Sequence, residues 1–212
     1  MLLALDTATP AVTVAVADGA DVLAERTSID PRRHGELLAP AVAEVLRVAG
    51  ITVGDLTRIA VGVGPGPFTG LRVGLVTART LGAALGLPVV GVCTLDVLAL
   101  QAVDDGLAGP FRVVTDALRR EVHWAEYVTD GGIRRVHGPH VDKPAALGWP
   151  GPAVGAGAMT YAADFPGARD PQHPAAAALC RWVARGLPLL DPDPLYLRRP
   201  DAVEPGARKP VR

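Results

Sequence analysis

Three polar side chains, Asp6, Thr7 and Thr9, close the first strand that the sequence predicts. A carboxylate at this point could help to hold Mg²⁺, because that ion prefers oxygen ligands, and the hydroxyls after it could face nucleotide phosphates. The same residues could instead bond the backbone of the turn that they begin, as Asp and Thr often do. Both interpretations stay open, so ATP or ADP is a weak candidate ligand and no cofactor is required.

The glycine-rich turn GPGPFTG at 64–70 is a second candidate for phosphate chemistry, because it opens a helix. Backbone N–H groups at the start of a helix bind anions well. The turn lacks the Gly-Lys-Ser/Thr of a P-loop, since Leu71 and Arg72 follow Gly70, and Pro67 stands where a GxGxxG motif needs its third glycine. A tight strand-to-helix connection is therefore the favoured interpretation.

Patterns for a metal site or a nucleophile are weak. His137 and His140 form the closest histidine pair, but the Gly-Pro between them prevents a helix from aligning both rings. Cys93 has no histidine nearby in the sequence that would activate it. His34 precedes the first predicted helix and is expected to face a partner or to begin that helix. We predict no catalytic residue and no metal site.

The elements that must position these residues follow an α/β order. Residues 2–27 are typical of a three-stranded meander. The pattern then predicts a helix at 35–49, a buried strand at 59–64, a long helix at 71–87, a short strand at 88–92 and a helix at 94–103. Strand-helix-strand order implies parallel pairing. By analogy, this order is that of the ribonuclease H-like half of actin-type and sugar-kinase-type proteins.

A break in the pattern at 104–106 predicts a lobe boundary, with an N-terminal lobe at 1–105 and a smaller, loop-rich lobe at 106–195. In the second lobe, strands are expected at FRVVTDA, EVHWAEYV and IRRVHG, and helices at about 174–185 and 159–163. Residues 196–212 form a tail with five basic residues against two acidic ones, or +3. A loose, solvated tail is favoured over a nucleic-acid contact.

Composition restricts the class of protein. The chain has 212 residues, of which 49% are hydrophobic and 20% charged, as in an ordinary folded domain. The net charge of −1 gives no overall attraction to nucleic acid. No apolar run is long enough to span a bilayer, and the N-terminus shows no export signal, so a cytoplasmic location is expected. Two cysteines are too few for a disulfide framework.

The long helix at 71–87 carries few polar residues, which is unusual for a helix on the surface of a monomer. Small residues recur every four positions along one face, at Gly70, Gly74, Ala78, Gly82 and Gly86. Such a ridge lets another backbone come close. The ridge could pack only against the protein's own sheet, or also against a partner.

Five segments together resemble the TsaB (YeaZ-like) family of the bacterial tRNA threonylcarbamoyladenosine machinery: LALDTAT, RRHGELLAP, GPGPFTGLRVGLVTARTLGAALGLPVVGV, TDALRREVHWAEY and PLYLRRPDA. The resemblance implies an actin-like (ASKHA) fold of two lobes. It also implies a non-catalytic dimerisation subunit that binds and activates a TsaD-type transferase, with a TsaE-type ATPase in the complex. Alone, such a chain would form a homodimer, and it would meet tRNA only through the complex.

The same resemblance implies which positions match the transferase's metal site and which residues form the dimer interface. The transferase relative carries a metal-binding HxxxH motif where this chain has Thr94 and Leu98, so transferase chemistry is not expected. The first helix and the ridge helix are implied as the dimerisation face, with these interface residues: His34, Leu38, Val42, Val45, Phe68, Arg72, Leu75, Ala78, Arg79 and Gly82. Two alternatives stay open. One is a stand-alone nucleotide-dependent transferase or glycoprotease-like peptidase, and the other is a homodimer that contacts tRNA through its basic tail.

Overall fold

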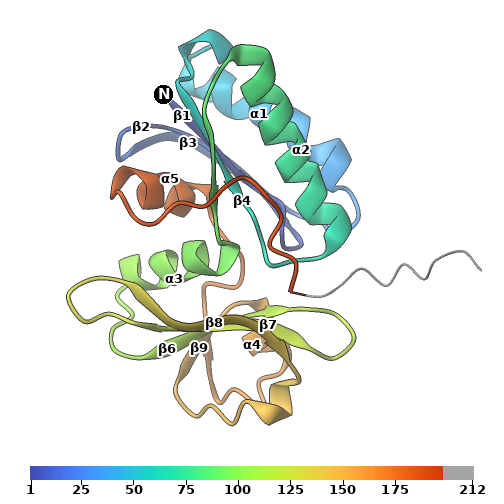
Figure 1. The fold of residues 1–212 in the computed structure, drawn as a ribbon, viewed down its shortest axis with the longest axis vertical. Coiled ribbons are helices and arrows are strands. Elements are labelled where there is room, and N and C mark those ends of the chain that lie inside the picture. Colours follow the sequence, from blue (N-terminus) through green and yellow to red (C-terminus); the bar gives the residue numbers. More distant parts are fainter. Residues whose placement is uncertain (198–212) are drawn as a thin grey trace, which may run out of the picture.

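The first sheet grows from the alternating apolar residues of the N-terminal meander. The computed structural model describes residues 1–197, and its first sheet has the order β3-β2-β1-β4-β5 (Figure 1). The strands are β1 (Leu2–Asp6), β2 (Ala11–Asp18), β3 (Asp21–Ile29), β4 (Arg58–Gly62) and β5 (Val89–Val92). β1 pairs antiparallel with β2 and β2 with β3, whereas β4 lies parallel to both β1 and β5. The parallel pairing that the sequence predicts is therefore confirmed.

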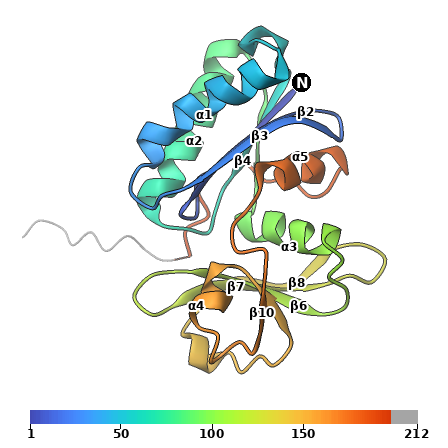
Figure 2. The ribbon, with the colours of Figure 1, turned by 180° about the vertical axis from the view of Figure 1, so that it is seen from behind.

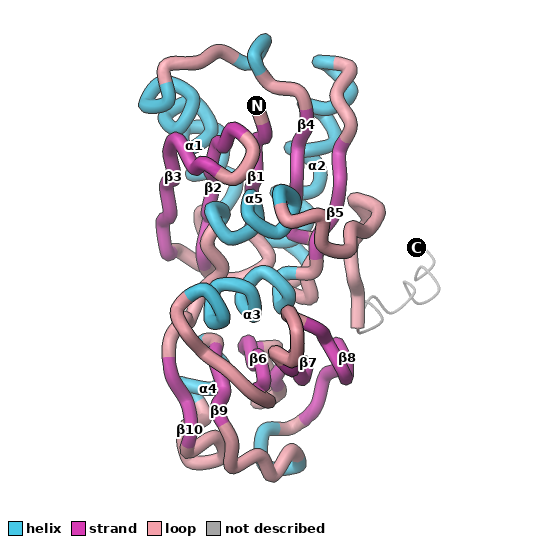
Figure 3. The backbone as a smooth tube through the Cα atoms, turned by 90° about the vertical axis from the view of Figure 1, so that its left-hand side faces the viewer, coloured by secondary structure: helices cyan, strands magenta, loops and turns pink. Residues whose placement is uncertain are grey.

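Helices cover both faces of this sheet. α1 (His34–Ala49) and α2 (Phe68–Leu85) lie side by side on one face, and α5 (Ala176–Ala184) lies on the other (Figure 3). Both long helices end at a glycine in the left-handed conformation, Gly50 and Gly86, as the sequence predicts for the first of them. The apolar stripes of α1 and α2 bury Leu38, Val45 and Leu71 against the sheet.

The second sheet repeats the topology of the first. Its strands are β6 (Phe111–Asp116), β7 (Val122–Val128), β8 (Arg134–Asp142), β9 (Pro152–Val154) and β10 (Gly167–Arg169), in the order β10-β9-β6-β7-β8. β6, β7 and β8 form an antiparallel meander, and β9 lies parallel to both β6 and β10. Strands six to ten thus occupy the places of strands one to five. Two ribonuclease H-like sheets in one chain confirm the expected two-lobed, actin-like α/β fold.

Two helices are exchanged between the sheets. α3 (Thr94–Asp104) follows β5 of the first sheet, yet Leu95 and Leu98 pack with Phe111 of the second. α5 follows β10 of the second sheet, yet Leu179 packs with Leu2 of the first. The two helices lie against each other between the sheets (Figure 2). The lobe boundary after residue 105, taken as the limit of an independently folding unit, stays a prediction.

The second lobe is reduced and rich in loops, as expected. The connection between β8 and β9 holds only a 3-10 turn (Pro144–Ala146), where the first lobe has α1. A short helix, α4 (Ala156–Thr160), packs on the outer face of the sheet. No helix within residues 1–197 has the length and apolar character needed to cross a membrane. The basic residues expected in the tail from 198 onward lie outside the described residues.

Candidate functional site

Asp6, at the end of β1, is enclosed by its own chain. Its carboxylate accepts a hydrogen bond from the Ala8 N–H (2.7 Å) and another from the Thr94 hydroxyl (2.8 Å). Gly62 lies so close that a Cβ there would overlap the carboxylate. Burial raises the pKa of Asp6 to about 6, and the hydrogen bonds from Ala8 and Thr94 act against that rise.

The two threonines after Asp6 also bond their own chain. The hydroxyl of Thr7 donates to the carbonyl oxygen of Gly70 (2.8 Å) and accepts from the N–H of Gly74 (2.9 Å). Thr9 accepts a bond from the Ala11 N–H (3.2 Å). Asp6 and Thr9 thus bond the turn that they begin, whereas Thr7 bonds α2. Binding of ATP or ADP here stays a prediction.

His34 joins the start of α1 to this loop. Its Nε2 donates to the carbonyl oxygen of Thr9 (2.8 Å), and its side chain is buried. The ring also lies beside Gly70, at the first turn of α2. From the sequence, His34 is expected either to face a partner or to begin the first helix. These contacts fit a residue that begins the helix.

The ridge of small residues on α2 faces the protein's own sheet. A Cβ on Gly70 would lie 2.7 Å from the carbonyl oxygen of Thr7, and a Cβ on Gly82 would overlap the side chain of Val89. Ala78 has no exposed surface. Close approach of α2 to β1 and β5 therefore explains the four-residue spacing, apart from Gly86, which ends the helix.

Seven of the ten implied interface residues lie inside this chain rather than on its surface. All seven are buried in the single chain: His34, Leu38, Val42, Val45, Leu75, Ala78 and Gly82. Phe68, Arg72 and Arg79 are exposed on α2. Contact of these ten residues with a partner stays a prediction, and in the single chain only these three are exposed.

The outward side of the helix pair carries mostly small or β-branched residues. We call the following exposed residues the outer stripe: Ala39, Pro40, Ala43, Thr69, Val76, Thr80 and Ala83. Val76 alone keeps 61% of its surface exposed. On α2 the outer stripe recurs at spacings of seven, four and three residues, from Thr69 through Val76 and Thr80 to Ala83, which is a helical period that the sequence contains.

A polar cluster joins α3 to the second sheet. Asp96, in the first turn of α3, accepts bonds from the Tyr127 hydroxyl (2.7 Å) and the Arg135 guanidinium (3.1 Å). Burial raises the pKa of Asp96, and Arg135 and Tyr127 act in the opposite direction. Cys93 lies beside this cluster, and burial raises the pKa of its thiol to about 12. It is therefore a protonated core residue at neutral pH and not an activated nucleophile.

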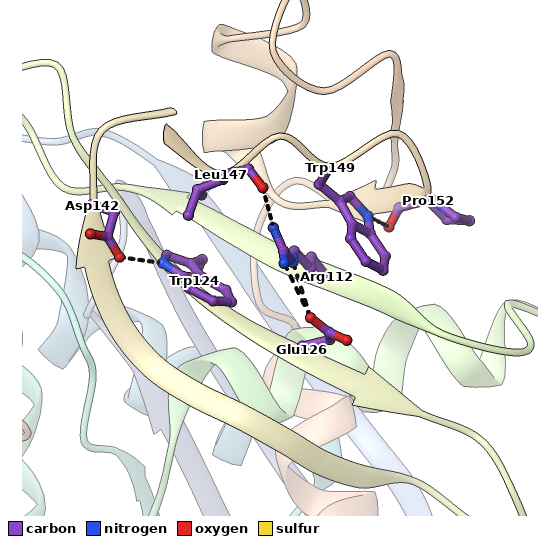
Figure 4. Close-up of polar contacts among 7 residues, drawn as sticks. All are labelled: Arg112, Trp124, Glu126, Asp142, Leu147, Trp149 and Pro152. Carbon is purple, nitrogen blue, oxygen red and sulfur yellow. Dashed lines mark hydrogen bonds and ion pairs between the residues drawn. The ribbon is translucent and has the colours of Figure 1, made fainter. Parts of the chain in front are cut away.

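The histidine pair lies on the outer face of the second sheet. The rings of His137 and His140 flank Trp124, with 4.7 Å between their centroids. Beside them, the Arg112 guanidinium lies between the rings of Trp124 and Trp149 (Figure 4).

This outer-face cluster is closed by its own hydrogen bonds. Arg112 donates to Glu126 and to the carbonyl oxygen of Leu147, while Trp124 donates to Asp142 and Trp149 to the carbonyl oxygen of Pro152 (Figure 4). These bonds fasten the loop after β8 to the sheet. Within the described residues, no group of three or more His, Cys, Asp or Glu side chains could hold a metal ion.

Three buried polar atoms in the described part of the chain have no hydrogen-bond partner: Thr115 Oγ1, His123 Nδ1 and His173 Nδ1. Thr115 and His123 face each other across β6 and β7. Burial lowers the pKa of His123 to about 4, so this imidazole is neutral at pH 7.

The duplicated topology and the exchanged helices place the chain among proteins of actin-like fold. In this chain the loop after β1 is closed by its own hydrogen bonds. Residues 21–180 match the family model described as TsaD, tRNA N6-adenosine threonylcarbamoyltransferase. YeaZ from Pseudomonas aeruginosa has a similar structure, with a TM-score of 0.79 and 31% identity over 92% of this chain and 99% of that one. The chain therefore belongs to the TsaB/YeaZ family.

Two relatives extend this assignment. An uncharacterized protein of Mycobacterium tuberculosis is 48% identical over 208 residues, which cover 95% of this chain and 93% of that protein. The Escherichia coli protein named tRNA threonylcarbamoyladenosine biosynthesis protein TsaB is 38% identical over 129 residues. That match covers 61% of this chain and 55% of the E. coli protein.

Proposed function

We propose that this chain is a non-catalytic subunit in the biosynthesis of threonylcarbamoyladenosine in tRNA, where it binds and activates a TsaD-type transferase. The names of its relatives supply the pathway. The observation that carries the binding role is the outer stripe of α1 and α2, which leaves a wide, weakly polar helix surface open to contact.

The outer stripe suits a helix-to-helix contact. Helices that face water in a monomer usually carry long charged side chains on that side. Here Ala39, Ala43 and Ala83 leave room for another backbone to approach, and Val76 and Thr80 lose little rotamer freedom when they are buried. A stable interface of this kind buries on the order of 1,600 Å² in total.

Residues at the transferase's metal positions support a non-catalytic role. By resemblance, Thr94 and Leu98 stand where the transferase has its two histidines. The Thr94 hydroxyl bonds Asp6, and Leu98 is enclosed in the core beneath α3. We propose that the chain needs no cofactor, works in the cytoplasm beside a TsaE-type ATPase, meets tRNA only through the complex and forms a homodimer when alone.

The test is reconstitution with the TsaD-type and TsaE-type proteins of the same organism. We expect no threonylcarbamoyl transfer to tRNA from this chain alone, stable co-elution with the transferase, and much faster transfer when the chain is added. Equal activity without the chain, or transfer by the chain alone, would contradict the proposal. Calorimetric titration of the chain with Mg-ATP separates the alternative of a stand-alone nucleotide enzyme, which requires tight binding.

A further inference from the structure

A groove runs along α2 where the C-terminal segment crosses it. We call residues 187–197 the strap. Leu190 exchanges two backbone hydrogen bonds with Gly91 on edge strand β5 (2.7 and 2.9 Å), and the Leu195 N–H bonds the carbonyl oxygen of Val63 (2.8 Å). The ring of Tyr196 then stacks on Phe68 at the start of α2, with 5.4 Å between centroids. The strap is thereby held as one wall of the groove, and α2 is the other.

The groove has an apolar floor and a cationic rim. Its volume is about 470 Å³, and Leu75, Val76 and Pro194 supply its apolar surface. Arg79 pairs with Asp193 across one part of the rim (3.0 Å), so that charge is balanced. The Arg72 guanidinium lies over the face of Phe68, 4.3 Å from the ring centroid, and makes no ion pair with any residue between 1 and 197. One positioned positive charge thus borders an apolar cavity.

We infer that this groove receives an acidic segment of the transferase partner, with a carboxylate bound to Arg72 and an adjacent apolar side chain against Leu75 and Pro194. The inference rests on the proposed function and deepens it, because it makes the strap and α2 together a recognition site that adjoins the outer stripe and shares Val76 and Thr80 with it. A guanidinium held over an aromatic ring keeps its N–H groups in a plane, ready for a carboxylate.

Charge argues against two other occupants. The chain's own residues 198–212 carry a formal charge of +3 and begin with two arginines, Arg198 and Arg199, which would meet the Arg72 charge unfavourably. A second copy would bring its own Arg72 to a groove whose described lining holds no carboxylate, and Asp193 of the strap already binds Arg79. An acidic segment from a different protein is the complementary occupant.

The experiment measures transferase binding by the full chain and its variants, together with cross-linking from inside the groove. Arg72→Ala should weaken binding at least tenfold, and Arg72→Glu should weaken it further through repulsion. Arg58→Ala is the matched control. Arg58 is exposed at the start of β4, whereas α2 follows the other end of that strand, so this variant should change affinity less than twofold. A photoreactive benzoyl-phenylalanine in place of Tyr196, which lines the groove from the strap and is not part of the outer stripe, should cross-link to a transferase peptide that contains Asp or Glu.

Each result decides the matter. Wild-type affinity in Arg72→Glu, while Ala83→Glu on the outer stripe abolishes binding, would overturn the groove assignment and leave the proposed function intact. A cross-link to residues 198–212, to a second copy, or to a transferase peptide without a carboxylate would also overturn it. Failure of the unmodified chain to bind the transferase would remove the proposed function and the groove assignment together.

Discussion

The hydroxyl of Thr7 bridges one turn of α2, because it donates to the carbonyl oxygen of Gly70 at 2.8 Å and accepts from the N–H of Gly74, four residues further on. A side chain from the end of β1 thus takes part in the hydrogen bonding of a helix that starts about sixty residues later in the chain. Only glycine fits at these two helix positions, since a Cβ on either would press on Thr7. The loop after β1 is thus part of the packing against α2.

Removing this hydroxyl should reduce stability without changing shape. Thr7→Val keeps the volume of the side chain but removes the two buried hydrogen bonds that its hydroxyl makes to Gly70 and Gly74, so we expect a loss of about 1–3 kcal/mol in the free energy of unfolding. Urea denaturation measures it. Thr69→Val, on the exposed side of the same helix, is the control and should change stability by less than about 0.5 kcal/mol. Equal stability of the two variants would refute the structural role of Thr7.

The ion pair of Asp96 with Arg135 should matter more than a surface pair. Both side chains are largely buried, with 11% and 28% exposed, so Arg135→Met leaves a buried carboxylate supported mainly by Tyr127. We expect a loss of about 1–3 kcal/mol at pH 7, less than for a fully buried pair. Because the pKa of Asp96 is raised, the loss should shrink as the pH falls and the carboxyl takes up a proton.

A double variant supplies the control for this pair. Asp96→Asn removes the charge that Arg135→Met would strand, so the double variant should recover part of the lost stability. Additive losses in the two single variants would mean that the residues act independently and that the pair does not hold α3 to the second sheet.

Stability should fall in acid through His123. Its pKa is about 4 in the folded state against 6.5 as reference, so the unfolded chain takes up the proton first as the pH falls. Stability is complete above about pH 6.5, and the loss between pH 6.5 and 4 should approach about 3 kcal/mol. Asp6 acts in the opposite sense, since its raised pKa means that its cost disappears as it is protonated below about pH 6.

The two effects are separated by His123→Phe. Nδ1 of His123 has no partner, so the variant should match the wild type at pH 7 within about 1 kcal/mol and lose less stability in acid. Parallel curves of unfolding free energy against pH for the two proteins would show that His123 is not the group responsible.

The sequence predicts the first lobe well because its signals are local. Alternation over β1 and β2, three- and four-residue spacing over α1, and a glycine after each long helix are all visible within short windows. β9 and β10 have three residues each, too few for any alternation, and they are defined by parallel pairing of β9 with β6 and of β10 with β9. The exchange of α3 and α5 was not predictable either, since an amphipathic pattern shows that a face is buried but not which sheet buries it.

The interaction site was predicted only in outline. The small residues at every fourth position of α2 correctly indicate a close approach, but the pattern does not identify the neighbour, which is Thr7 after β1 at Gly70 and Gly74 and the Val89 side chain of β5 at Gly82. The resemblance implies α1 and α2 as the contact face, which stays a prediction, and most of the residues named with it lie in the core. The groove beside Arg72 could not be predicted from the sequence, because the strap forms one of its walls. The position of the strap over α2 depends on contacts between residues more than a hundred positions apart in the chain.

The ridge and the outer stripe should respond oppositely to substitution. Gly82→Ala forces a Cβ against Val89, so we expect a loss of roughly 1–3 kcal/mol in stability and little direct effect on partner affinity. Thermal unfolding measures the first quantity and titration with the transferase subunit the second. Weakened binding with unchanged stability would place the ridge in the interface after all.

The central claim is that the outer stripe of α1 and α2 holds the partner. The most direct measurement is the dissociation constant of the TsaD-type subunit for Ala83→Glu, beside the unmodified chain and with the melting temperature of each. Ala83 is exposed, so we predict an unchanged melting temperature and binding weakened by a factor of about 100 or more, because a charge would be buried in the contact without a counter-ion. Unchanged affinity in a folded Ala83→Glu protein would contradict the account.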